Sequence, residues 1–327
     1  MRWIRVILAG TMLALLAAFL FWLGQRPAGD VGLKQAAAGI PGPEKTIRLG
    51  LIPERDIFAQ REAYRGFCEW VGRRMGAKVE LVTNASYEGV LEDFASKNID
   101  AAFLGSLVAV LAMDRQGAEV LTKSESIDGR STYAGVVFVP ESSPIKSFAE
   151  LQGHTLGAVK TTTAGPLFGV YIMSTLHGMV SDQVSPRFVW LGTHDDVMRE
   201  VTAGRVEAGA AKDLRLDAYE KRHPELAKFR RLASSQRVPD NALVVRAGWE
   251  SKEALREALL HMQDDAAGRQ ALSALGLGRY VPCAPKEYEP IYEMIAAIGP
   301  QWREVGIKGP PPERKGASSR PAKGGEK

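Results

Sequence analysis

The strongest constraint on the fold of this chain is an alternation of short β-branched runs with longer amphipathic segments. This alternation is typical of an α/β fold, in which crossover helices join the strands of a sheet. The first series predicts strands at 46–52, 78–82, 101–104, 119–122 and 133–139, with helices at 58–76, 86–97 and 105–115. The second series predicts strands at 155–159, 187–190 and 207–211, with helices starting near 164, 194 and 213. We therefore expect two similar α/β lobes.

The last part of the body is predicted to return to the first lobe. It has one more strand, 242–246, followed only by helices near 251–264, 266–275 and 286–299. The chain would then cross twice between the lobes and leave a cleft between them. The predicted division is lobe 1 at 46–139 plus 242–305, and lobe 2 at 140–241.

The N-terminal end carries an apolar run at residues 6–24 without a single charge. As a helix it would reach about 28 Å, enough to cross a hydrocarbon core of roughly 30 Å. Arg2 and Arg5 before it predict that the start of the chain lies in the cytoplasm and the body on the far side. Residues 1–25 are either an uncleaved signal anchor, which the length favours, or a cleaved signal peptide. Residues 26–45, rich in Gly, Ala and Pro, are predicted to be a linker.

The excess positive charge of the chain lies in its two ends. The net charge is +4 and the pI about 9.0, but subtracting the ends leaves about −3 for residues 44–307. Such a body has no general attraction for phosphate backbones, so we expect no nucleic-acid partner. The tail, residues 306–327, has no hydrophobic period and is predicted to be disordered.

The two cysteines, Cys68 and Cys283, are far apart in sequence and outside any metal-binding spacing. We expect two buried thiols, and a long-range disulfide stays open if the compartment is oxidising.

Polar side chains follow several predicted strands at the point where the next helix begins. Thr161, Thr162 and Thr163 stand at one such point, where hydroxyls and unpaired N–H groups can hold an oxyanion. An ordinary helix cap explains these threonines equally well. His194 and Lys212 stand at the next two points of the second lobe.

The first lobe offers fewer such groups. Tyr87 and Ser106 stand at predicted helix starts, and Tyr133 begins a strand from which it can reach the cleft. Ligands of open α/β sheets bind at the carboxyl ends of the strands, which favours a binding site made of these residues. A capping or packing role is the alternative for each of them.

The motifs of common enzymes are missing from the sequence. It contains no G-x-S-x-G, no H-E-x-x-H and no dinucleotide-binding fingerprint, and its histidines never stand at metal-ligand spacing. We therefore predict no enzymatic activity, no metal and no cofactor.

Seven segments together resemble a known family. They are GLIPERDIFAQREAYRGFCEWVGRRMGAKVELV, SYEGVLEDF, DAAFLGSLVAVLA, TTTAGPLFGVY, GTHDDVMREV, GAAKD and VPDNALVVR. In this order, from Lys45 to Gly299, they closely resemble the periplasmic phosphate, phosphite and phosphonate binding proteins of ABC transporters. The resemblance implies a type II periplasmic binding protein, with two lobes and two crossover strands, that closes over its ligand.

The resemblance also implies roles for individual residues. Thr161, Thr162 and Thr163 match the oxyanion-binding helix start, His194 matches the G-x-H motif and Tyr87 the Y-x-G motif. Tyr133 matches an aromatic strand position. Leu104 stands where some phosphonate binders carry an aromatic, which removes one hydroxyl donor, and Lys160 with Lys212 makes a doubly charged ligand plausible.

The predicted function is capture of phosphate, phosphite or a small phosphonate in the interlobe cleft for an ABC permease. The alternative is a membrane-anchored oxyanion sensor that signals to a membrane protein. The predicted location is the periplasm, tethered to the inner membrane through residues 6–24, or secreted after signal cleavage.

Overall fold

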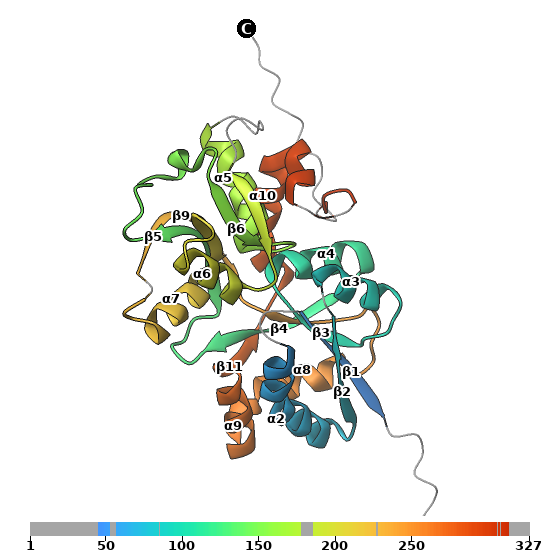
Figure 1. Cartoon of the computed structure of the whole chain (residues 1–327). Coiled ribbons are helices and arrows are strands. Elements are labelled where there is room, and N and C mark those ends of the chain that lie inside the picture. Colours follow the sequence, from blue (N-terminus) through green and yellow to red (C-terminus); the bar gives the residue numbers. More distant parts are fainter. Residues whose placement is uncertain are drawn as a thin grey trace, which may run out of the picture. The chain divides into compact units, whose positions relative to one another are not determined.

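The computed structural model describes residues 45–52, 57–84, 86–177, 186–226, 228–305, 307 and 309–313 (Figure 1). All of these belong to one unit, residues 45–327. The predicted anchor at residues 6–24 lies outside the described residues. Within the described ranges, no helix is long and apolar enough to cross a membrane.

The first lobe is built on a six-stranded sheet with the order β11-β4-β10-β3-β1-β2. Its strands are β1 (Thr46–Leu51), β2 (Lys78–Thr83), β3 (Ala101–Leu104), β4 (Glu119–Ser126), β10 (Ala242–Val245) and β11 (Leu277–Pro282). Strand β1 pairs in parallel with β2 and β3, whereas β10 runs antiparallel between β3 and β4. The strand that returns from the other lobe belongs to the first sheet, as predicted, and its place in the middle of that sheet was not predicted.

Helices cover both faces of this sheet. One face packs on α2 (Ile57–Met75), α8 (Lys252–Leu260) and α9 (Ala266–Ala274), the other on α3 (Tyr87–Ala95) and α4 (Ser106–Gln116). Successive side chains of β3 point to opposite faces. Phe103 therefore belongs to the hydrophobic cluster with α2, α8 and α9, and Leu104 to the cluster with α3 and α4. Every residue of β3 is buried for this reason, and its carboxyl end leads directly into α4.

The second lobe has a five-stranded sheet with the order β7-β6-β8-β5-β9. The strands are β5 (Thr132–Pro140), β6 (Thr155–Val159), β7 (Arg187–Leu191), β8 (Ala208–Lys212) and β9 (Phe229–Pro239). Its helices are α5 (Phe168–His177), preceded by the π-helical turn η2 (Thr163–Leu167), α6 (His194–Thr202) and α7 (Asp213–Arg222). The remaining elements are α10 (Glu289–Ile298) and the 3-10 turns η1 (Phe148–Leu151), η3 (Met262–Asp264), η4 (Pro285–Tyr288) and η5 (Gly299–Val305).

Each predicted strand is present, but two further strands were not predicted. Strand β9 lies at a sheet edge, is rich in Arg and Ser, and buries only Phe229, Val238 and Pro239. It therefore lacks the continuous apolar run by which the other strands were predicted. Strand β11 is another edge strand, in which only Tyr280 is buried. The prediction that only helices follow residue 246 was therefore wrong.

The predicted boundary between the lobes needs a correction at β5. This strand was assigned to the first lobe, but it pairs with β8 and β9 in the second sheet. The alternation of strands and helices does not encode which sheet an antiparallel strand joins. The first crossing therefore runs from Ser126 to Thr132, and the second from Pro239 to Ala242. Helix α10, assigned to the first lobe, packs against α5 of the second lobe as well as α4 (Figure 1).

The beginning of the predicted tail is held by the body. The Trp302 indole donates to the Gly309 carbonyl at 3.1 Å, and the Arg115 guanidinium donates to the Pro310 carbonyl at 2.9 Å. Ile307 is buried. The prediction of disorder from residue 306 onward was therefore wrong for this segment, and residues 314–327 lie outside the described residues.

The two cysteines are free, half-buried thiols, so no disulfide joins them. Burial raises the pKa of Cys68 to about 12 and that of Cys283 to about 11. Both thiols therefore stay protonated near neutral pH.

Candidate functional site

The predicted ligand-binding side chains all line one small enclosed space between the lobes. We call this space the inner pocket; its volume is about 10 Å³, roughly the room that one water molecule needs. Each of these residues is at most 7% exposed. They are Tyr87, Ser106, Tyr133, Thr161, Thr162, Thr163, His194 and Lys212.

The sheet topology explains why residues so far apart in sequence meet. Ser106 is the first residue of α4, and His194 is the first residue of α6, after a capping box formed by Thr193 and Asp196. Lys212 ends β8, immediately before α7. The carboxyl ends of the parallel strands in both sheets face the same cleft, which brings these helix starts together, and the amino end of the antiparallel strand β5 brings Tyr133 to them.

The three threonines span the end of the loop after β6 and the first residue of η2, and the backbone is strained at the first of them. Thr161 has φ +58°, a left-handed value that a β-branched residue rarely adopts. The Thr162 hydroxyl donates to the Val159 carbonyl at 2.8 Å and accepts from the Gly165 N–H at 3.1 Å. A Cβ at position 165 would lie only 2.7 Å from that hydroxyl oxygen, so glycine is required there. Thr162 therefore caps the turn, and its single proton is already used.

The other two hydroxyls of the loop have different partners. Thr161 donates across the cleft to the carboxylate of Glu88, which belongs to α3 of the first lobe. The Thr163 hydroxyl is buried and makes no hydrogen bond of good geometry within the described residues. Buried hydroxyls nearly always have a partner. Of the three threonines, Thr163 therefore has the hydroxyl least committed to other protein groups; its nearest polar neighbour is Tyr133.

Ser106 and Tyr133 form a second polar group at the pocket. The Ser106 hydroxyl donates to the Pro239 carbonyl at 2.6 Å, and its oxygen lies 3.3 Å from the Tyr133 hydroxyl. Burial raises the pKa of Tyr133, although the nearby Lys212 ammonium opposes this shift. Tyr133 therefore keeps its proton and can donate a hydrogen bond.

Lys212 brings a buried positive charge, and an acid already compensates it. Its ammonium lies 3.0 Å from Asp240 Oδ1 and 2.7 Å from Asn241 Oδ1, both on the second crossing. It also lies 4.7 Å from the centre of the Tyr133 ring. Lys160, which was expected to flank the site, is exposed and sits over the Trp190 ring instead. The expected second lysine charge is thus missing from the site.

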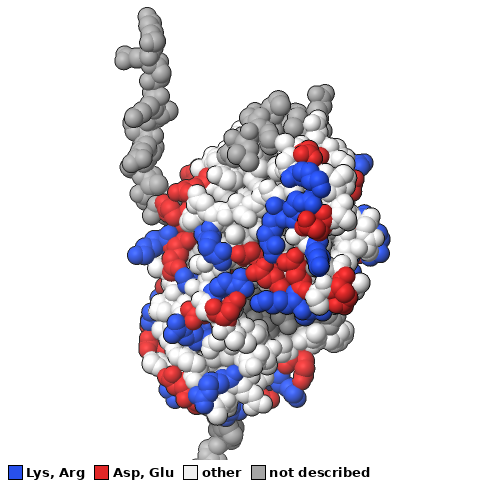
Figure 2. All heavy atoms as spheres, turned by 90° about the vertical axis from the view of Figure 1, so that its left-hand side faces the viewer, with Lys and Arg blue, Asp and Glu red and all other residues white. Residues whose placement is uncertain are grey.

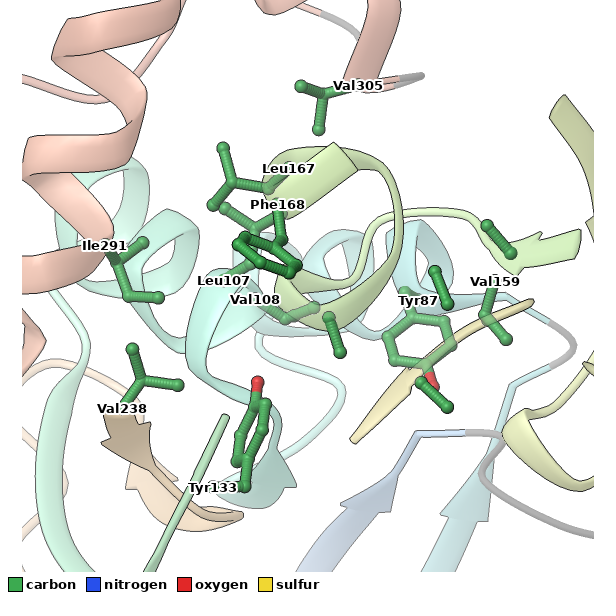
Figure 3. Close-up of a cluster of buried hydrophobic side chains, with 14 of the residues drawn as sticks. Tyr87, Leu107, Val108, Tyr133, Val159, Leu167, Phe168, Val238, Ile291 and Val305 are labelled. Atoms are coloured by element: carbon green, nitrogen blue, oxygen red, sulfur yellow. The ribbon is translucent and has the colours of Figure 1, made fainter. Parts of the chain in front are cut away.

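The surroundings of the polar groups are apolar. Figure 3 shows Tyr87 and Tyr133 among side chains of both lobes, including Leu107, Val108 and Phe168. The Tyr133 hydroxyl points into this cluster (Figure 3). Hydrogen bonds made in such a poorly solvated place are stronger than in water. The described residues contain no group of three His, Cys, Asp or Glu side chains that could hold a metal ion.

Three residues at the site were not predicted from the sequence. Glu88, Asp240 and Asn241 contact Thr161 or Lys212, but they do so from the other lobe or from a crossing. A polar pair directly before the predicted strand 242–246, Asp240 and Asn241, was the one available signal. Glu88 in the first turn of a helix was indistinguishable from an ordinary acidic helix start.

A comparison with protein-family models matches residues 49–288, most of the described chain, to a single family. Its description is "ABC transporter, phosphonate, periplasmic substrate-binding protein". The chain belongs to this family. The resemblance inferred from the sequence motifs is thereby confirmed.

Two curated members of this kind match parts of the chain. The phosphonates-binding periplasmic protein of Escherichia coli K12 is 26% identical over 108 residues, which cover 33% of this chain and 32% of that protein. The phosphate-import protein PhnD of Mycolicibacterium smegmatis is 29% identical over 195 residues, 55% of this chain and 58% of that protein. The matched regions thus span less than two thirds of either relative.

Solved structures of phosphonate-binding proteins share the fold. A binding protein component of an ABC phosphonate transporter from Pseudomonas aeruginosa has a TM-score of 0.69 at 18% identity, covering 80% of this chain and 92% of that one. PhnD1 from Prochlorococcus marinus, solved with methylphosphonate, has a TM-score of 0.66 at 18% identity, covering 76% and 97%. The predicted fold class, a two-lobe periplasmic binding protein, is confirmed.

Proposed function

We propose that this chain captures a small phosphorus oxyanion in the inner pocket and delivers it to an ABC permease. The observation that carries this proposal is the set of eight buried polar side chains around one small space, in which the Thr163 hydroxyl faces Tyr133 but makes no well-formed hydrogen bond among the described residues. Family membership and the fold support the same conclusion.

The affinity would come from hydrogen bonds to a charged ligand in a dry site. Thr163, Tyr133 and His194 supply donors, and N–H groups at the start of η2 add to them. Hydrogen bonds to ions are roughly twice as strong as neutral ones. The pocket holds no bond-breaking machinery of a known type, so we infer binding without chemistry.

The carboxylate of Glu88 favours an anion that carries a proton. Glu88 does not itself line the inner pocket, but it accepts a hydrogen bond from Thr161, which does, so one side chain separates its charge from the proposed anion. A fully deprotonated anion is repelled there, whereas a P–OH group can donate to a carboxylate. Phosphate and phosphonates can keep a proton near neutral pH and sulfate does not. We therefore infer selection of a phosphorus anion against sulfate.

Entry of the ligand requires the lobes to separate. A pocket of about 10 Å³ is too small for a tetrahedral oxyanion, and the bond from Thr161 to Glu88 joins the two lobes across it. The two crossings are the segments about which the lobes can rotate. Closure around the anion would then be the state that the permease recognises.

The cellular setting is part of the same proposal. The family places the protein in the periplasm. We infer tethering to the inner membrane, or release after signal cleavage, from residues 6–24 alone. The sensor alternative rests on the same residues, which lie outside the described ones.

A thermal-shift series on the purified full chain tests the binding function. Methylphosphonate, 2-aminoethylphosphonate, phosphite, phosphate and sulfate are added separately to ligand-free protein. A ligand at 100 times its Kd stabilises the native state by about 2.7 kcal/mol and raises the melting temperature. We expect a selective rise with phosphorus anions. A folded, ligand-free chain that melts at the same temperature with all five would contradict the proposal.

A further inference from the structure

A second and much larger cavity lies beside the inner pocket, and we call it the outer cleft. Its volume is about 670 Å³, within the range of sites that hold whole organic ligands. Lys212 lines both spaces, and its partners Asp240 and Asn241 line the outer cleft. The ion pair between Lys212 and Asp240 is therefore the partition between the two spaces.

The wall formed by the first lobe is aromatic. Tyr64 of α2 lies over Phe103 with ring centres 5.6 Å apart, and Phe103 stacks on Tyr280 at 5.6 Å with 19° between the planes. All three residues line the outer cleft. Phe103 and Tyr280 are only 3% and 2% exposed and support the wall from the core, so the half-buried Tyr64 ring is the one against which a flat apolar group can pack.

The wall formed by the second lobe is one side of α7. Leu214 and Ala218, four residues apart, supply its apolar part, and Arg215 and Lys221 supply positive charge. The lining acids, Asp128 and Asp240, are each in an ion pair with a lining cation, Arg130 and Lys212. Among the described lining residues, cations therefore exceed acids by two. Figure 2 shows the left-hand side of Figure 1, where charged side chains of both signs crowd the middle of the face.

We propose that the outer cleft binds the organic substituent of the phosphorus anion, and that this substituent is aromatic. This inference rests on the proposed function, because the phosphorus group would occupy the inner pocket. The substituent would then pass Lys212 and lie between the aromatic wall and α7. A methyl group or a hydroxyl would leave the outer cleft filled with water.

The test compares methylphosphonate with phenylphosphonate by calorimetric titration of the full chain. We expect the phenyl compound to bind the unmodified protein at least tenfold more tightly. Ala218→Trp fills the outer cleft from α7, and we expect it to abolish this tenfold preference. The matched control is Ala297→Trp on α10, an equally exposed helical alanine outside the cleft, which should keep the preference.

The outcomes separate the two proposals. If methylphosphonate binds but phenylphosphonate binds no better, the aromatic subsite is refuted while the proposed function stands. If the tenfold preference survives Ala218→Trp, the phenyl group lies elsewhere and the subsite is again refuted. If neither compound binds a folded protein, both proposals fall.

Discussion

Two similar substitutions in the three adjacent threonines should have different effects, one on ligand binding and the other on folding stability. Thr163→Val and Thr162→Val each replace a buried hydroxyl with a methyl group of similar size. The Thr163 hydroxyl makes no well-formed hydrogen bond within the described structure, whereas the Thr162 hydroxyl makes two. The first change should therefore affect binding, and the second should affect folding.

The magnitudes follow from these contacts. Loss of a hydrogen bond to a charged ligand costs about 1.5–3 kcal/mol, so Thr163→Val should raise the Kd roughly 10- to 150-fold. It removes an unsatisfied buried polar group, so the ligand-free protein should be as stable as before or slightly more stable. Thr162→Val leaves the Val159 carbonyl and the Gly165 N–H without their partner, and it should destabilise the chain by about 1–3 kcal/mol.

Two measurements on each variant test which threonine hydroxyl binds the ligand. Urea unfolding without ligand gives the change in the free energy of unfolding, and calorimetric titration with the anion that binds the unmodified chain gives the change in Kd. If Thr163→Val binds the anion normally, or destabilises the chain as much as Thr162→Val does, the assignment of the donor hydroxyl is wrong.

Three further changes test other contacts. Glu88→Gln removes the carboxylate beside the pocket, so sulfate should bind better relative to phosphonate in titrations; an unchanged preference would remove Glu88 from the selectivity argument. Asp240→Ala leaves the buried Lys212 ammonium without its counter-charge and should cost about 3 kcal/mol in urea unfolding, while a loss below 1 kcal/mol would show that water compensates it. Hydrogen bonds from His154, then from the Thr155 N–H, lower the pKa of Glu207 to about 2 from its usual 4.5. This contribution to stability is complete above pH 4.5 and disappears as the pH falls toward 2, so Glu207→Gln should lose less melting temperature than the unmodified chain between pH 6 and pH 3. Equal losses would contradict the role of Glu207.

The central strands were predictable because they are buried and therefore consist mostly of apolar residues. Strand β3 is buried on both faces and reads as a continuous apolar run, and β6 and β8 behave similarly. The edge strands β9 and β11 bury fewer residues and carry polar side chains, so the same signal is weak in them. The sheet to which each strand belongs was harder to predict, because β5 pairs with strands more than seventy residues away in sequence.

The positions of the candidate site were predictable, but the partners of each side chain were not. Thr161, Thr162 and Thr163 look alike in sequence, yet their hydroxyls meet a carboxylate, a backbone carbonyl and no well-placed partner. Thr161 has a φ of +58° and donates to the other lobe, and local sequence does not encode such a φ for threonine. Lys212 was expected to place a positive charge beside the ligand, but Asp240 on the second crossing already pairs with that charge.

The second crossing carries a consequence for how selectivity can change. Ser106 holds the Pro239 carbonyl and Lys212 holds Asp240 and Asn241, so two pocket residues also restrain the segment about which the lobes rotate. Apparent affinity equals intrinsic affinity multiplied by the fraction of molecules that can close. A substitution of Ser106 or Lys212 alters both factors at once. A new ligand preference obtained at these two positions would therefore come with a new equilibrium between open and closed lobes, whereas changes at Thr163 can alter recognition alone.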